Sequence, residues 1–221
     1  MHDVIVELLR VQGRVRFVHA ATMALVTSFF AERVAANLTS GARRHPLGFL
    51  FVSEPLGVNL ILRYHFWPAD WAMPHGQEGG RTHDHCYELN SLVVAGSLRQ
   101  RTFQAVRDVD GGHDVLEVDY THTPMSSALR RTGLRARLDE QTDEVFSPGT
   151  AYRLASGTVH HVEAVTLPAA TLVLTVPIPG APAPRVLVPC DQDAPGEFLR
   201  DRLDAAEVAT AREAINRLIL E

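Results

Sequence analysis

The spacing of apolar positions along the chain changes twice and divides it into three parts. In residues 3–38 apolar side chains recur with a period of about 3.6, which predicts one or two helices. From residue 47 to residue 176 the apolar runs are short and are separated by turn residues, which is typical of β-strands. A proline-rich run over residues 177–184 ends this pattern, and residues 204–221 return to a helical period.

The helical ends have recognisable boundaries. Asp204 and Glu207 form a capping box that begins the C-terminal helix. Residues 39–46 contain glycine, arginine and proline and separate the N-terminal helices from the strands. These N-terminal helices either cover one end of the β-structure, which is the simpler role, or form an arm that binds a partner.

The middle of the chain predicts a mainly β (all-β) protein. About ten short strands with turns at regular intervals favour a barrel or double-sheet sandwich over a parallel α/β sheet. No internal repeat is visible, which indicates one structural domain made of a helical segment (1–45), a barrel (46–180) and a linker with a C-terminal helix (181–221). Residues 121–132 are expected to form a loop, and Gly96 is expected to separate two strands.

Composition narrows the class of protein. The net charge is −5 and no basic stripe with interleaved aromatic residues is present, which argues against a nucleic-acid partner. All 21 basic residues are arginine, which excludes Schiff-base chemistry on a lysine and is typical of a GC-rich bacterial genome. Cys86 and Cys190 are too few for a disulfide framework, and the apolar run 17–31 is too short to span a bilayer. We therefore expect a reduced, cytoplasmic protein without a membrane partner.

Two histidines one residue apart provide the first chemical signal. His83-Asp84-His85 follows a glycine-rich segment and precedes an apolar strand. Side chains in a strand alternate between its faces, so His83 and His85 point the same way, with their Cα atoms about 7 Å apart. Two neutral imidazoles at this spacing can bind one metal ion, for which a third ligand must come from another segment.

A later segment offers that third ligand. A turn at Ser156-Gly157 leads into His160 and His161 at the start of a predicted strand. These two histidines point to opposite faces, so only one can join the pair described above. The spacing to Gly157 favours His160.

Taken in order, these segments resemble the two motifs of the cupin superfamily. The first motif is a glycine, a His-x-His pair, a glutamate and a closing glycine; the second is a glycine, a Pro-x-Gly turn and a histidine. The corresponding residues are Gly76, His83, His85, Glu88 and Gly96, then Gly149, Ala155-Ser156-Gly157 and His160, with alanine in place of the proline. The resemblance implies a jelly-roll (double-stranded β-helix) barrel with flanking helices, and it is compatible with a homodimer, which cupins often form.

A closer resemblance is to the cysteine-dioxygenase-like (thiol dioxygenase) branch of that superfamily. There, an apolar strand that ends in tryptophan precedes His-Asp-His, as residues 59–67 do here, and the segment 152–163 resembles the branch's second motif. The resemblance implies that His83, His85 and His160 bind Fe(II). The branch's Ser-x-His-x-Tyr strand falls at residues 171–175, where its histidine and tyrosine are both missing, which argues against a thiol amino acid as substrate.

Three further residues are candidates for the site. Glu88 lies one residue closer to His85 than the cupin glutamate does, and it either ligates the metal or pairs with an arginine. Arg63 and His65 share one face of their predicted strand and are candidates for lining the pocket. Arg63 is also the nearest candidate for holding a carboxylate.

These residues lead to one main hypothesis and two alternatives. The main hypothesis is a mononuclear non-haem Fe(II) dioxygenase or oxygenase that acts with O₂ on a small organic molecule, because three histidine ligands leave positions open for both. The His-x-Asp signature of 2-oxoglutarate enzymes is absent. The alternatives are a redox-neutral cupin isomerase, lyase or decarboxylase that uses Zn, Mn or Ni, and a ligand-binding cupin without enzymatic activity.

Overall fold

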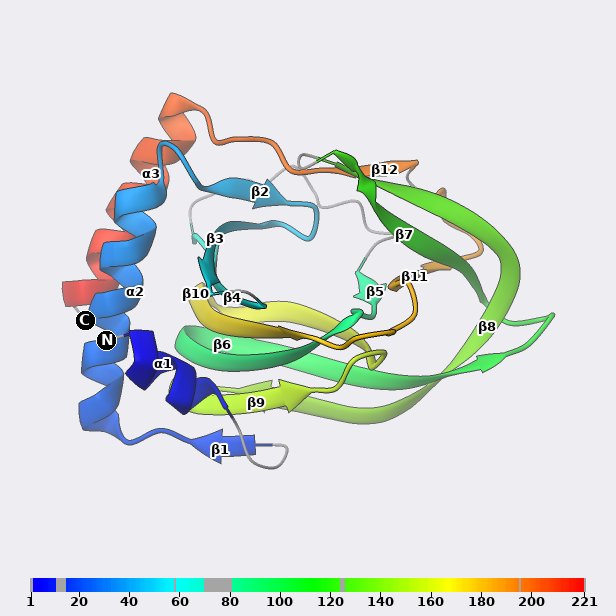
Figure 1. The fold of residues 1–221 in the computed structure, drawn as a ribbon, viewed down its shortest axis with the longest axis horizontal. Coiled ribbons are helices and arrows are strands. Elements are labelled where there is room, and N and C mark those ends of the chain that lie inside the picture. Colours follow the sequence, from blue (N-terminus) through cyan, green and yellow to red (C-terminus); the bar gives the residue numbers. More distant parts are fainter. Residues whose placement is uncertain are drawn as a thin grey trace.

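The computed structural model describes residues 2–10, 15–57, 59–69, 81–123, 126–194 and 196–220. Within them, three helices lie on one side of an antiparallel β-structure, and strands β7 and β8 extend on the opposite side (Figure 1). The helices are α1 (His2–Leu9), α2 (Ala20–Asn37) and α3 (Ala205–Leu220). The predicted mainly β fold with helices at both ends is confirmed.

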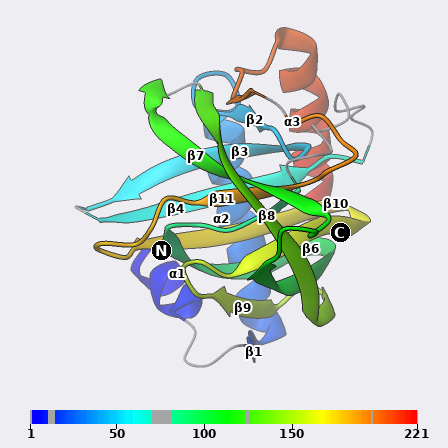
Figure 2. The same cartoon turned by 90° about the vertical axis from the view of Figure 1, so that its right-hand side faces the viewer.

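The strands are β1 (Val15–Phe17), β2 (Arg43–His45), β3 (Phe49–Leu56), β4 (Leu60–Trp67), β5 (Thr82–His83), β6 (Tyr87–Arg107), β7 (His113–Thr123), β8 (Ser126–Phe146), β9 (Thr150–Leu154), β10 (Val159–Pro177), β11 (Arg185–Pro189) and β12 (Glu197–Leu199). Viewed from the side of β7 and β8, these two strands lie in front of the sheet and the helices lie behind it (Figure 2). None of the helices formed by the described residues combines the length and apolar character needed to cross a membrane.

Strands β6 and β10 join two sheets. They pair along most of their length, from Tyr87 opposite Pro177 to Phe103 opposite Val159. The first part of β6 also pairs with β9, and its second part pairs with β8. Likewise β10 pairs with β5 near its start and with β4 near its end. The two sheets therefore share one central strand pair.

One of these sheets closes on itself. Strands β6, β8, β7, β11, β5 and β10 pair in this order, and β10 pairs back with β6. The other sheet is open and runs in the order β1, β9, β6, β10, β4, β3 and β2. Closure of a ring of strands removes unpaired edges, as in other β-barrels. The predicted barrel is therefore present.

The two halves of β6 meet at Gly96, where a break between two strands was predicted. The strand continues through Gly96, while its register with β10 shifts between Ala164 and Thr171. Gly96 has a φ of 65°, and a Cβ atom there would lie 2.3 Å from the carbonyl oxygen of Thr166 and 2.5 Å from that of Pro168. Glycine is required for both reasons, the backbone angle and the close approach.

Side chains along the strands alternate between two faces: one face packs into a core beneath the helices, and the other lines the barrel interior. Phe30 of α2 packs against Tyr64 and Phe66 of β4, with ring centroids 5.9 and 6.4 Å apart. The residues of β4 that alternate with Tyr64 and Phe66 face the other way and line the barrel cavity: Arg63, His65 and Trp67. Buried residues of all three helices belong to the core beneath the helices, so the helices cover the sheet. This is the simpler of the two roles predicted for the N-terminal helices.

Several strands lie where the sequence did not predict them. The expected loop at 121–132 is wrong, because β7 continues to Thr123 and β8 begins at Ser126. Cross-strand pairs here are largely polar, such as Glu117 opposite Arg130, so no apolar alternation reveals the strands. In addition, β1, β2, β11 and β12 lie outside residues 46–180 and still pair into the sheet.

The capping box at the start of α3 is confirmed. The Glu207 N–H donates to Asp204 Oδ1 at 2.9 Å, and the Asp204 N–H donates to Glu207 Oε2 at 2.8 Å.

Replacement of Gly96 by alanine should destabilise the protein strongly. We expect the free energy of unfolding to fall by about 3 kcal/mol or more, because the strain of a positive φ adds to overlap with the backbone of β10. Gly180→Ala is the control: its φ is 75°, but no atom lies within 4 Å of the added Cβ. The control should lose only about 1–2 kcal/mol. Urea denaturation measures both, and equal losses would contradict the explanation.

Candidate metal centre

The structure brings together the three histidines that the sequence selected. One candidate ligand atom from each of His83, His85 and His160 lies within 4.8 Å of the other two. The ring centroids are 4.7 Å apart for His83 and His85, 4.5 Å for His83 and His160, and 5.1 Å for His85 and His160. His83 and His160 are register partners in adjacent strands β5 and β10, so backbone pairing sets their relative positions.

Asp84, between the two ligand candidates, anchors this segment to β11. Its side chain is buried and accepts hydrogen bonds from the backbone N–H of Arg185 at 2.6 Å and from Arg185 Nε at 2.7 Å. The Asp84 N–H in turn donates to the Arg185 carbonyl at 2.9 Å. Because neighbouring side chains along an extended segment alternate in direction, this anchor holds the imidazoles of His83 and His85 toward the other side. Sequence analysis gave Asp84 no role, since its partner lies 101 residues away.

The turn before His160 also fixes the backbone of His85. The His85 carbonyl accepts hydrogen bonds from the Gly157 N–H at 2.9 Å and from the Ser156 hydroxyl at 3.2 Å. Gly157 has a φ of 77°, which explains the glycine at this turn. The two segments that carry the histidines are therefore joined directly by hydrogen bonds.

Backbone carbonyls set which ring nitrogen carries the proton in two of the histidines. His83 Nδ1 lies 3.0 Å from the carbonyl oxygen of Arg81, and His160 Nδ1 lies 3.0 Å from that of Thr158. A carbonyl only accepts, so each Nδ1 is the donor and each Nε2 keeps a free lone pair. This arrangement is typical of metal-binding histidines. In His85, Nδ1 is buried and has no protein partner.

All three imidazoles are held in the neutral form. Burial lowers the pKa of His83, and burial together with the neighbouring histidines lowers the pKa of His85 well below its usual value. Burial, followed by repulsion from His83, lowers the pKa of His160 to about 3. Neutral imidazoles are the form that binds metals.

These residues fit a transition-metal ion. They offer three neutral nitrogen donors on converging side chains, two of them with the tautomer fixed, and one buried nitrogen that lacks a partner. Imidazole donors suit Fe(II), Zn(II), Mn(II) or Ni(II), and the donor set does not distinguish among these ions.

Glu88 lies apart from the three histidines. Its carboxylate forms an ion pair with Arg153 of β9 and accepts a hydrogen bond from Asn90 Nδ2 at 3.0 Å. On β6 it alternates with Tyr87 and Leu89, which line the cavity, so it points to the opposite face. Burial alone would raise the pKa of Glu88, but the hydrogen bonds from Arg153 and Asn90 outweigh burial and lower it. Of the two roles considered for Glu88, the structure shows the arginine pair.

Arg63 and His65 both line the cavity beside the histidines, as their shared strand face predicted. Arg63 Nη1 donates to the Tyr87 hydroxyl at 3.2 Å, and the guanidinium carbon lies 5.2 Å from the centre of the Tyr87 ring. Tyr87 itself stacks on His85 with a centroid distance of 4.6 Å. Burial, and then the charge of Arg63, lower the pKa of His65 to about 3, so this side chain is neutral near pH 7.

The histidines stand between two cavities of different size. The inner cavity has a volume of about 60 Å³ and is lined by all three histidines. The outer cavity has a volume of about 710 Å³ and is lined by His83 and His85 but not by His160. Its wall includes Tyr120 of β7 and Arg200 after β12, which sequence analysis missed because these residues belong to no motif.

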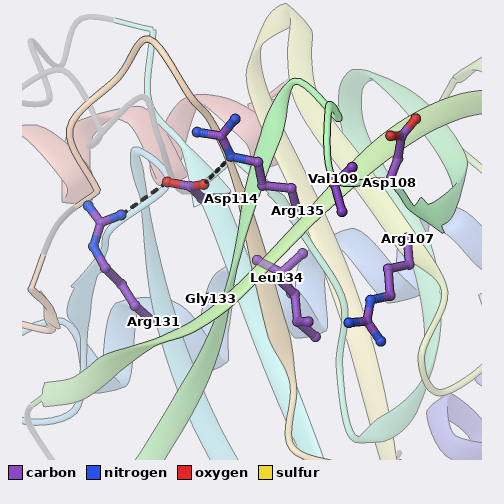
Figure 3. A pocket seen from close by; sticks show the side chains of 9 residues that line it. Arg107, Asp108, Val109, Asp114, Arg131, Gly133, Leu134 and Arg135 are labelled. Atoms are coloured by element: carbon purple, nitrogen blue, oxygen red, sulfur yellow. Dashed lines mark hydrogen bonds and ion pairs between the residues drawn. The ribbon is translucent and has the colours of Figure 1, made fainter.

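A third hollow is separate from the histidines. It has a volume of about 300 Å³ and lies between the β6–β7 turn and β8 (Figure 3). Its arginines Arg131 and Arg135 both pair with Asp114, at 3.0 and 3.4 Å. None of its lining residues also lines either of the two cavities beside the histidines. Gly76, the glycine that opens the first cupin-like motif, lies outside the described residues.

Comparison with known proteins gives distant structural likenesses only. No protein-family model and no curated protein matches the chain. Similar solved structures include DMSP lyase DddQ from Ruegeria pomeroyi, with 15% identity, a TM-score of 0.42, and 86% of this chain and 77% of that chain covered. A variant of oxalate decarboxylase from Bacillus subtilis has 11% identity and a TM-score of 0.37, with 76% of this chain and 30% of that chain covered. HEPD from Streptomyces albus, with 2-hydroxyethylphosphonate and Fe(II) bound, has 9% identity and a TM-score of 0.34, with 61% of this chain and 22% of that chain covered.

This chain thus spans 30% of the oxalate decarboxylase chain and 22% of the HEPD chain. Such distant likenesses carry no argument about function, which rests on the geometry of the site.

His160→Ala should abolish tight metal binding. Loss of a group that only hydrogen-bonds a metal ligand costs about 10–100-fold in metal affinity, so loss of a ligand itself should weaken binding by at least about 100-fold. His161→Ala is a matched control, because this residue is adjacent on β10 and points to the other face. Competition with a chelator followed by elemental analysis measures both variants. Equal metal loss in the two variants would contradict the assigned site.

Glu88→Gln should leave the metal content unchanged. The carboxylate is already engaged by Arg153 and Asn90, so the variant loses only a partly exposed ion pair, worth about 1 kcal/mol or less. Elemental analysis and thermal unfolding test this expectation. A metal content that falls with Glu88→Gln would show that the glutamate is a ligand.

Proposed function

We propose that this protein is a mononuclear non-haem Fe(II)-dependent oxygenase that acts with O₂ on a small organic molecule. The observation that carries this proposal is the set of three neutral, converging histidines at the boundary between a small inner cavity and a large outer one. Fe(II) held by His83, His85 and His160 would supply the electrons that activate O₂, and three protein ligands leave positions for substrate and O₂.

The inner cavity supports this proposal by its size and its walls. A volume of about 60 Å³ holds a diatomic molecule or about two waters. Half of the side chains around it are aliphatic, phenylalanine, tryptophan or tyrosine residues, including Phe49, Trp67, Leu89, Leu98, Leu154, Val162 and Val173. Such walls exclude bulk water from a reactive centre.

The outer cavity is large enough for an organic substrate. Ligand sites commonly occupy about 300–1,000 Å³, and the outer cavity has a volume of about 710 Å³. His83 and His85 face this cavity, so a molecule bound there lies next to the candidate metal centre. Tyr87, stacked on His85 and hydrogen-bonded to Arg63, forms a fixed wall beside the histidines.

The residues that hold the histidines have a positioning role in this proposal. Asp84 through Arg185 and the Ser156-Gly157 turn fix the backbone on both sides of His85. The carbonyls of Arg81 and Thr158 orient the rings of His83 and His160. Rigid support of this kind keeps ligands in one geometry during reaction.

Fe(II)-loaded protein should consume O₂ in the presence of a substrate. We expect a panel of small organic acids to contain compounds that stimulate O₂ uptake, with incorporation of isotopically labelled oxygen into the product seen by mass spectrometry. Zn(II)-loaded protein and the His160→Ala variant should be inactive, because Zn(II) does not supply redox chemistry. Turnover without O₂, or equal turnover with Zn(II), would contradict the proposal and would favour a redox-neutral metalloenzyme.

A further inference from the structure

Three arginines line the outer cavity, Arg43, Arg63 and Arg200, and two of them have no carboxylate partner among the described residues. Among the described residues, neither Arg63 nor Arg200 forms an ion pair, although both line this cavity. Asp84 is the one carboxylate among the described residues of the cavity wall, and it is already held by Arg185. Several other arginines of the barrel do form ion pairs, such as Arg153 with Glu88 and Arg99 with Asp143. The cavity therefore carries uncompensated positive charge.

Arg63 provides the inner of these two charges. It extends from β4 on the face that lines the barrel interior, next to Tyr87 and close to His85. Its Nε atom is buried and has no hydrogen-bond partner, and Nη1 donates only to the Tyr87 hydroxyl. A buried donor without an acceptor is costly, which indicates that a bound molecule completes this site.

Arg200 provides the second charge from another wall. It follows β12, and its guanidinium carbon lies 5.8 Å from the centre of the Tyr120 ring on β7. Burial is the main cause that lowers the pKa of Arg200, and the positive charge of Arg63 lowers it further, whereas Tyr120 raises it. The two guanidinium groups thus repel each other across one cavity.

We infer that the substrate of the proposed oxygenase is an organic dianion, with one carboxylate held by Arg63 beside the histidines and a second held by Arg200. Each guanidinium lies over its own tyrosine, Tyr87 or Tyr120, so the two form separate subsites instead of one clamp. A planar guanidinium matches a carboxylate through two parallel hydrogen bonds. Two carboxylates give Arg63 and Arg200 one partner each, whereas a single carboxylate leaves one of these two guanidinium groups unpaired.

The rest of the cavity wall suits the carbon skeleton of such a molecule. Val118, Val186 and Phe198 line the outer cavity and belong to one apolar cluster between β7, β11 and β12. An apolar body can pack on these side chains while its charged ends reach the two arginines. The inferred ligand class is therefore a small dicarboxylate with an apolar middle.

Matched acids test this inference without iron or O₂. Straight-chain dicarboxylates from succinate to suberate are titrated calorimetrically into metal-free and Zn(II)-loaded protein, each beside the monocarboxylate of equal length. We expect the best dicarboxylate to bind about tenfold or more tightly than its monocarboxylate, because the second charge engages Arg200. If metal-free and Zn(II)-loaded protein show the same preference for dicarboxylates, simple chelation of the metal by the acid is excluded.

Variants assign the two ends of the ligand. Arg200→Gln should remove the preference for dicarboxylates over monocarboxylates. Arg63→Gln should weaken the binding of both classes of acid. Arg99→Gln removes an exposed arginine that is paired with Asp143. This control variant should change neither the affinity for the acids nor the preference for dicarboxylates. The melting temperature of ligand-free Arg200→Gln should not fall, because the variant removes an uncompensated charge.

Several results would overturn the inference. The first is that no dicarboxylate binds, and the second is that the protein binds dicarboxylates and monocarboxylates with equal affinity. The third is that the Arg200→Gln variant still prefers dicarboxylates. A lower melting temperature with unchanged affinity would show that Arg200 is structural. The outcome is separate from that of the proposed function: O₂ uptake with a monoanionic substrate contradicts only this inference, and dicarboxylate binding without O₂ uptake contradicts only the oxygenase.

Discussion

The pairing of β6 with β10 is the interaction on which the rest of the structure depends. These two long strands belong to both sheets, and they change from one to the other at Gly96, where only a glycine allows β10 to approach. Along one half of the pair the sheet faces the helices, and along the other half it closes into a ring with β5, β11, β7 and β8. The histidine segments begin at the ends of these strands: β10 starts one residue before His160, and β6 starts two residues after His85.

The site depends on hydrogen bonds between segments distant in sequence. Asp84 binds β11, and the His85 carbonyl accepts hydrogen bonds from the turn before β10, so the barrel holds the two residues that follow His83 along the chain. The inner cavity is lined by the three histidines and by many aliphatic and aromatic side chains. The outer cavity is lined by two arginines that form no ion pair among the described residues, and one of them, Arg63, also lines the inner cavity. The chemistry proposed here needs both: a dry side for O₂ and a charged side for the substrate.

Much of the fold and the histidine triad follows from local sequence. Turn residues between short apolar runs predicted a barrel or a double-sheet sandwich. Strand alternation predicted that Arg63 and His65 face the cavity, and the Ser156-Gly157 turn selected His160 over His161. What could not be predicted depends on distant pairing. The ends of β7 and β8 within residues 121–132 show no apolar alternation, the partner of Glu88 is set by the neighbouring strand β9, and Arg200 reaches the cavity only because β12 pairs with β8.

The ring of six strands is closed through β5, which is two residues long. A barrel opens most easily at its shortest seam, since few backbone hydrogen bonds hold it, and here that seam contains His83. Local opening of the seam and release of an ion from the three histidines are therefore one linked equilibrium. In this protein the bound ion would act as a cross-link that completes the barrel, and the occupancy of the site would set how rigid the barrel wall is.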